Sequence, residues 1–228
     1  ADLDADAPIW VLETSSFTLH YTNEASPDIY LLLPVAPDHL SWHGSYEAYV
    51  EAKLKPLSSM REGQVAIVPK AFADVETDAF LITYENAEEL AGYFGIETAK
   101  VKFKGAFLLD ALIAMGVEKV LYDTIDYDKI NAFMLDPHRQ EELHDLSGRL
   151  WVNDTKATNI DAAVRALACY DTVYWIAGGL AKEGGLAGVE LEVGRQGRQV
   201  AGGLLGEDHL AALGVHRHEG QLLHLNGP

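Results

Sequence analysis

The sequence has a single cysteine, few cations and no long apolar run. The lone cysteine, Cys169, excludes an internal disulfide and fits a reducing compartment. Only 17 Lys and Arg residues face 35 Asp and Glu residues, and the net charge of −18 argues against a nucleic-acid binder and a polybasic membrane anchor. No stretch approaches the roughly 18 apolar residues of a spanning helix, and the acidic N-terminus has no signal-peptide pattern. These absences predict a cytoplasmic protein that does not insert into a membrane.

Two phosphate-binding motifs are also missing. The 228 residues contain neither GxxxxGK[ST] nor GxGxxG, so these residues do not hold the usual phosphate cradle. The composition is otherwise that of a globular protein, with 48% hydrophobic and 23% charged residues. At roughly 100–200 residues per domain, this length allows one large domain or two small ones.

Short apolar runs alternate with helical patterns along the chain, which predicts an α/β fold with a largely parallel sheet. Strands are expected at residues 9–12, 29–35, 64–68, 79–84, 100–104, 150–152 and 172–177. Helices are expected at residues 46–57, 87–94, 106–115, 126–135 and 159–170. Ser45 and Asn86 are the expected caps of the first two helices.

A polar stretch from residue 137 to residue 148 predicts a domain junction. It separates a first domain, residues 1–136, from a second at 137–185, whose strand, helix and strand form one βαβ unit. Residues 186–228 are an atypical Gly-rich tail. The last 46 residues hold 11 of the 20 glycines and no Phe, Trp, Tyr or Ile, so they offer little bulk for a core and at most a short helix near 207–213.

Two of the expected strands are followed by side chains that can bind a cation. Glu13 follows the first and His39 follows the second, and ligands of doubly wound sheets bind beyond the carboxyl ends of strands. A carboxylate suits Mg²⁺, and an imidazole is acceptable in a mixed shell. Each also has a purely structural interpretation, Glu13 as a cap and His39 as a loop histidine, with His43 a solvated neighbour. Lys53 alone would be a surface residue.

The segment from Asn153 to Asn159 is the most informative, because it leads from a strand into a helix. Asp154, Thr155, Lys156 and Thr158 crowd hydrogen-bonding groups onto one turn, and the helix start leaves N–H groups free for an anion. A polar turn needs no function, but a cap does not need a lysine.

Two further cations stand beside this segment as candidates. Lys182 follows Gly178 and Gly179, as a point charge for a carboxylate or phosphate or as part of a surface loop. Arg139 lies at the expected junction, where ligand sites often form.

Together these segments resemble the Mur ligase family of bacterial cell-wall synthesis over about residues 9–182. The resemblance rests on Leu12-Glu13-Thr14-Ser15-Ser16-Phe17, Pro37-Asp38-His39-Leu40 with His43-Gly44, Tyr49 with Ala52-Lys53-Leu54, Pro137-His138-Arg139, and Asn153-Asp154-Thr155-Lys156-Ala157-Thr158-Asn159. The Ser-Ser-Phe and Lys-Ala-Thr-Asn motifs are most similar to members that add D-glutamate. The resemblance implies ATP-driven amide formation through an acyl phosphate, with Mg²⁺, on UDP-N-acetylmuramoyl-L-alanine, in a bacterial cytoplasm.

The resemblance also implies a role for each motif residue. Mg²⁺ would be held by Glu13, His39 and Lys53, of which His39 and a Lys53 carbamylated by CO₂ would be catalytic. The nucleotide would contact Arg139, Asp154, Lys156 and Asp110, the last being the only residue that could stand in for the second Asn of the family's adenine run. Ser15 would face the UDP-muramoyl peptide, and Thr158 and Lys182 would hold the D-glutamate carboxylates.

The sequence departs from the family pattern at both ends. The family's phosphate loop and UDP-binding domain precede the Glu13 segment, where this chain has 12 residues, and the tail beyond about residue 185 does not match. We therefore expect an interior fragment: the latter part of the central ATPase domain and the start of a Rossmann-like C-terminal domain. Such a fragment would come from a truncated gene model and be inactive alone. The alternatives are another Mur ligase, a folylpolyglutamate synthase-like ligase, and a non-catalytic binding protein.

Overall fold

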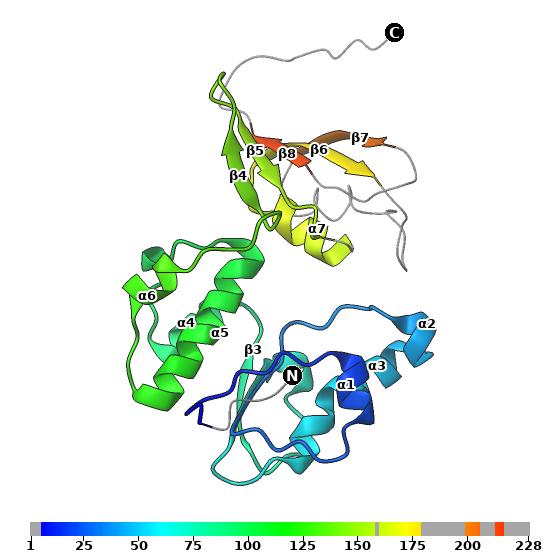
Figure 1. The fold of residues 1–228 in the computed structure, drawn as a ribbon, viewed down its shortest axis with the longest axis vertical. Coiled ribbons are helices and arrows are strands. Elements are labelled where there is room, and N and C mark those ends of the chain that lie inside the picture. The colour runs from blue at the N-terminus through cyan, green and yellow to red at the C-terminus, as the bar shows by residue number, and fades with distance from the viewer. Residues whose placement is uncertain (1–5, 158–159, 179–198, 206–212, 217–228) are drawn as a thin grey trace. The chain divides into compact units, whose positions relative to one another are not determined.

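The computed structural model describes residues 6–157, 160–178, 199–205 and 213–216, and the chain divides into two compact units. The first unit is Ala1–Glu85 and the second is Asn86–Pro228 (Figure 1). This division does not test the predicted boundary at residues 136 and 137, which stays a prediction. None of the described helices is long and apolar enough to cross a membrane.

The first unit combines a small parallel sheet with short helices. Its elements are α1 (Ser16–Tyr21), β1 (Ile29–Leu31), α2 (Leu40–His43), α3 (Tyr46–Leu54), η1 (Lys55–Ser59), β2 (Val65–Pro69), η2 (Lys70–Phe72) and β3 (Phe80–Tyr84). The sheet order is β1-β2-β3, and both pairs are parallel, with Ile29 opposite Val65 and Val65 opposite Phe80. The strands predicted at 64–68 and 79–84 are confirmed within one residue.

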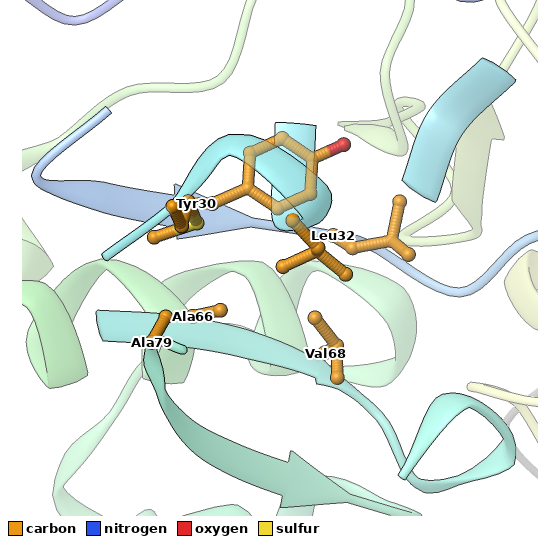
Figure 2. Close-up of a cluster of buried hydrophobic side chains, with 7 residues drawn as sticks. Tyr30, Leu32, Ala66, Val68 and Ala79 are labelled. Carbon is orange, nitrogen blue, oxygen red and sulfur yellow. The ribbon is translucent and has the colours of Figure 1, made fainter. Parts of the chain in front are cut away.

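One buried cluster of the first unit lies on one face of this sheet. A cluster of buried side chains joins the strands to η1 (Figure 2). It consists of Tyr30, Leu32, Leu57, Met60, Ala66, Val68 and Ala79. The middle strand, β2, is buried from Ala66 to Val68, as expected for a parallel strand with neighbours on both sides.

The apolar run at residues 9–12, predicted as a buried strand, is an irregular and exposed segment. Val11 is 90% exposed and Leu12 60%. A strand needs a hydrogen-bonded neighbour, and within the described residues this run pairs with none of the three strands of the sheet. The run predicted at 29–35 is a three-residue strand at the sheet edge, where Tyr30 and Leu32 are buried while Leu31 and Leu33 are exposed.

The second unit begins with a helical segment. Its elements are α4 (Ala87–Phe94), η3 (Thr98–Lys100), α5 (Gly105–Tyr122) and α6 (Tyr127–Ala132). The predicted Asn86 cap is confirmed, since its Oδ1 accepts the Glu89 N–H at 2.9 Å. Helices α4 and α5 pack closely where Gly116 faces the ring of Phe94. The helix predicted at 106–115 extends to residue 122. The helix predicted at 126–135 is shorter and ends at Ala132.

The strand predicted at residues 100–104 is wrong. Two of its backbone groups pair with one side chain, because Asn131 Oδ1 accepts the Lys102 N–H at 2.8 Å and Asn131 Nδ2 donates to the Lys100 carbonyl at 2.8 Å. This amide takes the place that a neighbouring strand would occupy. An alternation of apolar and charged side chains can thus also occur in a loop that a side chain holds by hydrogen bonds.

The second unit ends in a mixed five-stranded sheet. Its elements are β4 (Glu141–His144), β5 (Leu150–Asn153), α7 (Ile160–Leu167), β6 (Thr172–Gly178), β7 (Gln199–Leu205) and β8 (Leu213–His216). The order is β4-β5-β8-β6-β7 (Figure 1). Strand β8 is antiparallel to both β5 and β6, so β5 and β6 run in the same direction, as the predicted βαβ unit requires, with β8 inserted between them.

The C-terminal part of the chain differs from its expectation. It contributes two strands, β7 and β8, where the sequence predicted no more than a short helix. Most of that helix, near 207–213, lies outside the described residues. The α/β class with parallel strands and covering helices is confirmed.

Candidate functional site

The first candidate segment leads into α1. Ser15 is the N-cap of this helix, and its Oγ accepts the Thr18 N–H at 3.1 Å. Glu13 precedes it in the exposed segment. Ser16, the first helical residue, is 3% exposed, although serine is usually a surface residue. The local structure therefore fixes Ser15 by capping and leaves the carboxylate of Glu13 in solvent.

His39 occupies a strained turn between β1 and α2. Its φ of 56° lies in the left-handed region that non-glycine residues rarely adopt. The N–H of His39 donates to Asp38 Oδ1 at 3.0 Å, and the imidazole Nε2 lies 3.6 Å from Asp38 Oδ2. Helix α2 then ends after one turn at Gly44, whose φ of 85° favours glycine. His39 therefore lies in a turn held by Asp38 and not at the end of a regular strand.

Lys53 lies in the last turn of α3, whose predicted N-cap, Ser45, is confirmed by its bond from the Ala48 N–H at 3.2 Å. The Lys53 Nζ lies 5.2 Å from the ring centroid of Tyr49, one helical turn earlier. Burial lowers the pKa of Lys53, and the charge of Asp38 opposes this shift. A partly buried amine of lowered pKa is a better nucleophile than an ordinary surface lysine.

A group of rings, which we call the aromatic cluster, brings α1, α2 and α3 together. Phe17 lies 4.8 Å from the ring of His39 and 5.7 Å from that of His43, and His43 lies 5.3 Å from that of Tyr49. Trp42 completes the cluster at 4.5 Å from His43. His39, Lys53 and the start of α1 therefore belong to one neighbourhood.

His43 is not the solvated neighbour that the sequence predicted. Its ring is half-buried, and its Nε2 lies 3.0 Å from the hydroxyl of the buried Ser16. Burial lowers the pKa of His43, with smaller contributions from His20, His39 and Lys53. Sequence reasoning missed the aromatic cluster, for which the one available signal was the density of rings among residues 17–49.

The second candidate group lies in the second unit, where two motifs 15 residues apart in the sequence meet. Lys156 N–H donates to the His138 carbonyl at 3.2 Å, and Asn153 Nδ2 lies 2.7 Å from His138 Nδ1. His138 and Gln140 have positive φ values of 68° and 46°. The Pro137–Gln140 turn is therefore held against the Asn153–Lys156 turn by specific hydrogen bonds, and its strained backbone is typical of ligand sites.

Asp154 is the buried acid of this group. It is 7% exposed, and its Oδ1 accepts the Gln140 N–H at 3.2 Å. Burial raises the pKa of Asp154, while this hydrogen bond and the charge of Arg139 oppose the shift. Arg139 also acts on Asp110 of α5, where partial burial of the carboxyl group raises the pKa and Arg165 and Arg139 lower it. Three of the four predicted nucleotide-binding residues thus interact electrostatically.

The other predicted site residues fall outside what the structure describes. Thr158 and Lys182 lie outside the described residues. A shallow depression with about 160 Å³ of open space lies elsewhere in the first unit, lined by Leu19, Thr22, Asn23, Ala25, Lys55, Pro56 and Ser59. None of the predicted site residues lines it.

A known family model matches the first part of this chain. The model of the Mur ligase middle domain matches residues 1–110. The family resemblance drawn from the motifs is therefore confirmed.

Two curated relatives carry the same name. The UDP-N-acetylmuramoylalanine--D-glutamate ligase of Campylobacter jejuni (serotype O:23/36, strain 81-176) is 54% identical over 170 residues, covering 75% of this chain and 42% of the relative. The protein of that name from Helicobacter pylori (strain HPAG1) is 43% identical over 192 residues, covering 77% and 46%. The chain spans less than half the length of these relatives.

A solved structure supports the fold. The crystal structure of MurF ligase from Thermotoga maritima in complex with ADP aligns with a TM-score of 0.54 at 19% identity, covering 80% of this chain and 49% of that one. At this identity the similarity establishes the fold alone.

Proposed function

We propose that this chain is part of an ATP-dependent ligase that joins D-glutamate to UDP-N-acetylmuramoyl-L-alanine in the bacterial cytoplasm. The observation that carries the proposal is the 54% identity over 170 residues to a ligase of that name. A carboxylate is a poor electrophile until one of its oxygens becomes a leaving group. Transfer of the ATP γ-phosphate to the substrate carboxylate would give an acyl phosphate, and the amine of D-glutamate would then displace phosphate.

The first unit would supply the Mg²⁺ ligands Glu13, His39 and Lys53. Within the described residues no three His, Cys, Asp or Glu side chains gather as a metal site would. The proposed set contains two such side chains and a lysine, whose ammonium would repel a cation. The set fits Mg²⁺ only if Lys53 becomes an anion, and its lowered pKa supports carbamylation. Mg²⁺ would neutralise the crowded phosphate oxygens during transfer.

The second unit would hold the nucleotide. Arg139 and Lys156 carry positive charge on the two turns that His138 and Asn153 join. The buried Asp154 would orient the Gln140 end of the first turn and accept a hydrogen bond from the nucleotide, and Asp110 would stand near the base. Ser15 would contact the UDP-muramoyl peptide, and Thr158 and Lys182 the D-glutamate carboxylates.

An acceptor screen on the full protein encoded by the gene tests this proposal. With ATP and UDP-N-acetylmuramoyl-L-alanine, we expect phosphate release with D-glutamate and none with L-alanine, a diamino acid or a D-alanyl dipeptide. Turnover with a different acceptor would transfer the assignment to another ligase of this type. Nucleotide binding without turnover would favour a binding protein. The 228-residue chain alone is expected to form no product.

A further inference from the structure

Tyr30 connects the sheet of the first unit to the helix that carries Lys53. The side chain is 9% exposed and belongs to the buried cluster on the sheet face. Figure 2 shows its ring among the aliphatic side chains, with the hydroxyl oxygen at the edge of the group. That hydroxyl donates a hydrogen bond to the Lys53 backbone carbonyl at 2.5 Å. Burial raises the pKa of Tyr30 to about 12, so the phenol stays a donor at neutral pH.

The Lys53 carbonyl lies near the end of its helix, where helical donors become fewer. Helix α3 continues into η1, where Pro56, three positions after Lys53, has no N–H to offer this carbonyl. The Tyr30 phenol gives this carbonyl a donor from outside the helix.

Lys53 has a contact at its backbone carbonyl and another at its amine. Tyr30 holds the backbone carbonyl, and the ring of Tyr49 lies 5.2 Å from the Nζ at the other end. A long side chain with several rotatable bonds can hold one direction only if the helical turn beneath it is fixed. The bond to Tyr30 fixes that turn relative to β1.

We propose that Tyr30 is a positioning residue for Lys53, aiming its amine for carbamylation. This inference rests on the proposed function, in which carbamylated Lys53 is a Mg²⁺ ligand. In the reaction the amine lone pair attacks the carbon of CO₂, a C–N bond forms, one C–O π bond becomes the carbamate oxygen's lone pair, and the displaced N–H proton goes to solvent. Tyr30 touches none of the reacting atoms and acts through the backbone of Lys53.

Another buried tyrosine of this unit provides a matched control. Tyr84 is 1% exposed, and its hydroxyl donates to the Leu32 backbone carbonyl at 2.7 Å. Tyr30→Phe and Tyr84→Phe thus each remove one buried bond from a phenol to a backbone carbonyl, but only the first bond reaches Lys53. An effect on general stability is common to both variants, and an effect on positioning is confined to Tyr30→Phe.

The experiment measures Lys53 directly in the full protein. Reductive methylation followed by mass spectrometry gives the rate at which the Lys53 amine reacts, and ¹³C NMR with labelled bicarbonate gives its carbamate occupancy at fixed pH. For Tyr30→Phe we expect faster methylation, by about fivefold, because a loosened amine is more accessible to the reagent, and a carbamate occupancy lower by a similar factor, as the loss of one buried hydrogen bond would give. Tyr84→Phe should match the wild type in both.

Each outcome decides between the two claims. Unchanged methylation in Tyr30→Phe, or an equal change in both variants, overturns the positioning role. Faster methylation in Tyr30→Phe alone supports it, even if the wild type shows no carbamate. In that last case the amine is positioned as inferred, but the carbamylated ligand in the proposed function is wrong.

Discussion

The two groups of candidate residues are held together by different forces. In the first unit, His39 and Lys53 stand beside an aromatic cluster, where Phe17, His43 and Tyr49 lie ring against ring. In the second unit, backbone hydrogen bonds to His138 and Asp154 join two polar turns. Packing of rings depends on volume and tolerates small shifts, whereas a hydrogen-bonded turn depends on particular atoms. Each site is therefore sensitive to a different kind of substitution.

The largest expected effect comes from emptying the core of each unit. Leu57 of the first unit and Leu112 of the second are both 0% exposed. We expect Leu57→Ala and Leu112→Ala each to lower the free energy of unfolding of their own unit by about 2–5 kcal/mol. Hydrogen exchange resolved by residue measures both. Equal loss of protection throughout the chain in both variants would mean that the two units unfold as one.

Alanine at the two candidate lysines should separate their roles. In the full protein, Lys53→Ala should lower kcat by more than about 100-fold, since losing even an outer partner of a metal costs 10–100-fold. Lys156→Ala should instead raise the KM for ATP. The controls are Lys70→Ala and Lys129→Ala, whose side chains are 54% and 73% exposed. A raised KM for ATP with unchanged kcat in Lys53→Ala would contradict the metal assignment.

The packing of α4 on α5 can be tested with two glycines. A Cβ on Gly116 would lie 2.6 Å from Phe94 Cε2, and Phe94 is 7% exposed and has little room to move. Gly116→Ala should therefore lower the free energy of unfolding by about 1–3 kcal/mol. Gly92, in α4, would meet nothing within 4 Å, so Gly92→Ala should raise stability by about 0.5–1 kcal/mol. Urea denaturation of both variants measures the difference, and a stabilising Gly116→Ala would show that α5 can shift.

The smallest expected effect is a pH dependence of the stability of the second unit. Asp145 accepts hydrogen bonds from Trp151 Nε1 at 3.1 Å and Arg149 Nε at 2.7 Å. The bond from Trp151, followed by those from Arg149 and Ser147, holds the pKa of Asp145 well below its ordinary 3.8. A carboxylate of depressed pKa contributes stability above its unfolded pKa, and this contribution is lost as the pH falls through the folded pKa.

Asp145→Asn should therefore be less stable than the wild type at pH 7, and the gap should begin to narrow below about pH 4 and keep narrowing as the pH falls towards the folded pKa. Urea midpoints across this range measure it. The control is Asp74→Asn, an exposed residue of the first unit, which should leave the midpoint of the second unit unchanged. A gap independent of pH would assign the effect of Asp145→Asn to the shape of the amide.

Local chemistry explains which parts of the fold were predictable. The Ser45 and Asn86 caps were predicted correctly because a cap bonds to an N–H three residues away. The strand at 9–12 was wrong because a strand needs a distant neighbour, and the strand at 100–104 was wrong because Asn131 supplies those bonds. The insertion of β8 depends on pairs as distant as Leu150 with His216, which periodicity does not report.

The candidate site divides in the same way. The motifs identified which side chains carry the chemistry, and the resemblance they support is confirmed at the level of the family. Contacts such as His43 with Ser16 and Tyr30 with Lys53 depend on tertiary packing, so no pattern along the chain indicates them. The ligand roles of Glu13, His39, Lys53, Arg139, Asp154 and Lys156 stay predictions.

The place of β8 in the sheet has a consequence for biosynthesis. Ribosomes deliver β5 and β6 first, yet these strands meet only through a strand that ends at residue 216. Until that residue leaves the exit tunnel, the edges of β5 and β6 that pair with β8 have unpaired amide and carbonyl groups. Such edges invite pairing with other nascent chains. A stall before β8 is translated would therefore make this polypeptide prone to aggregation.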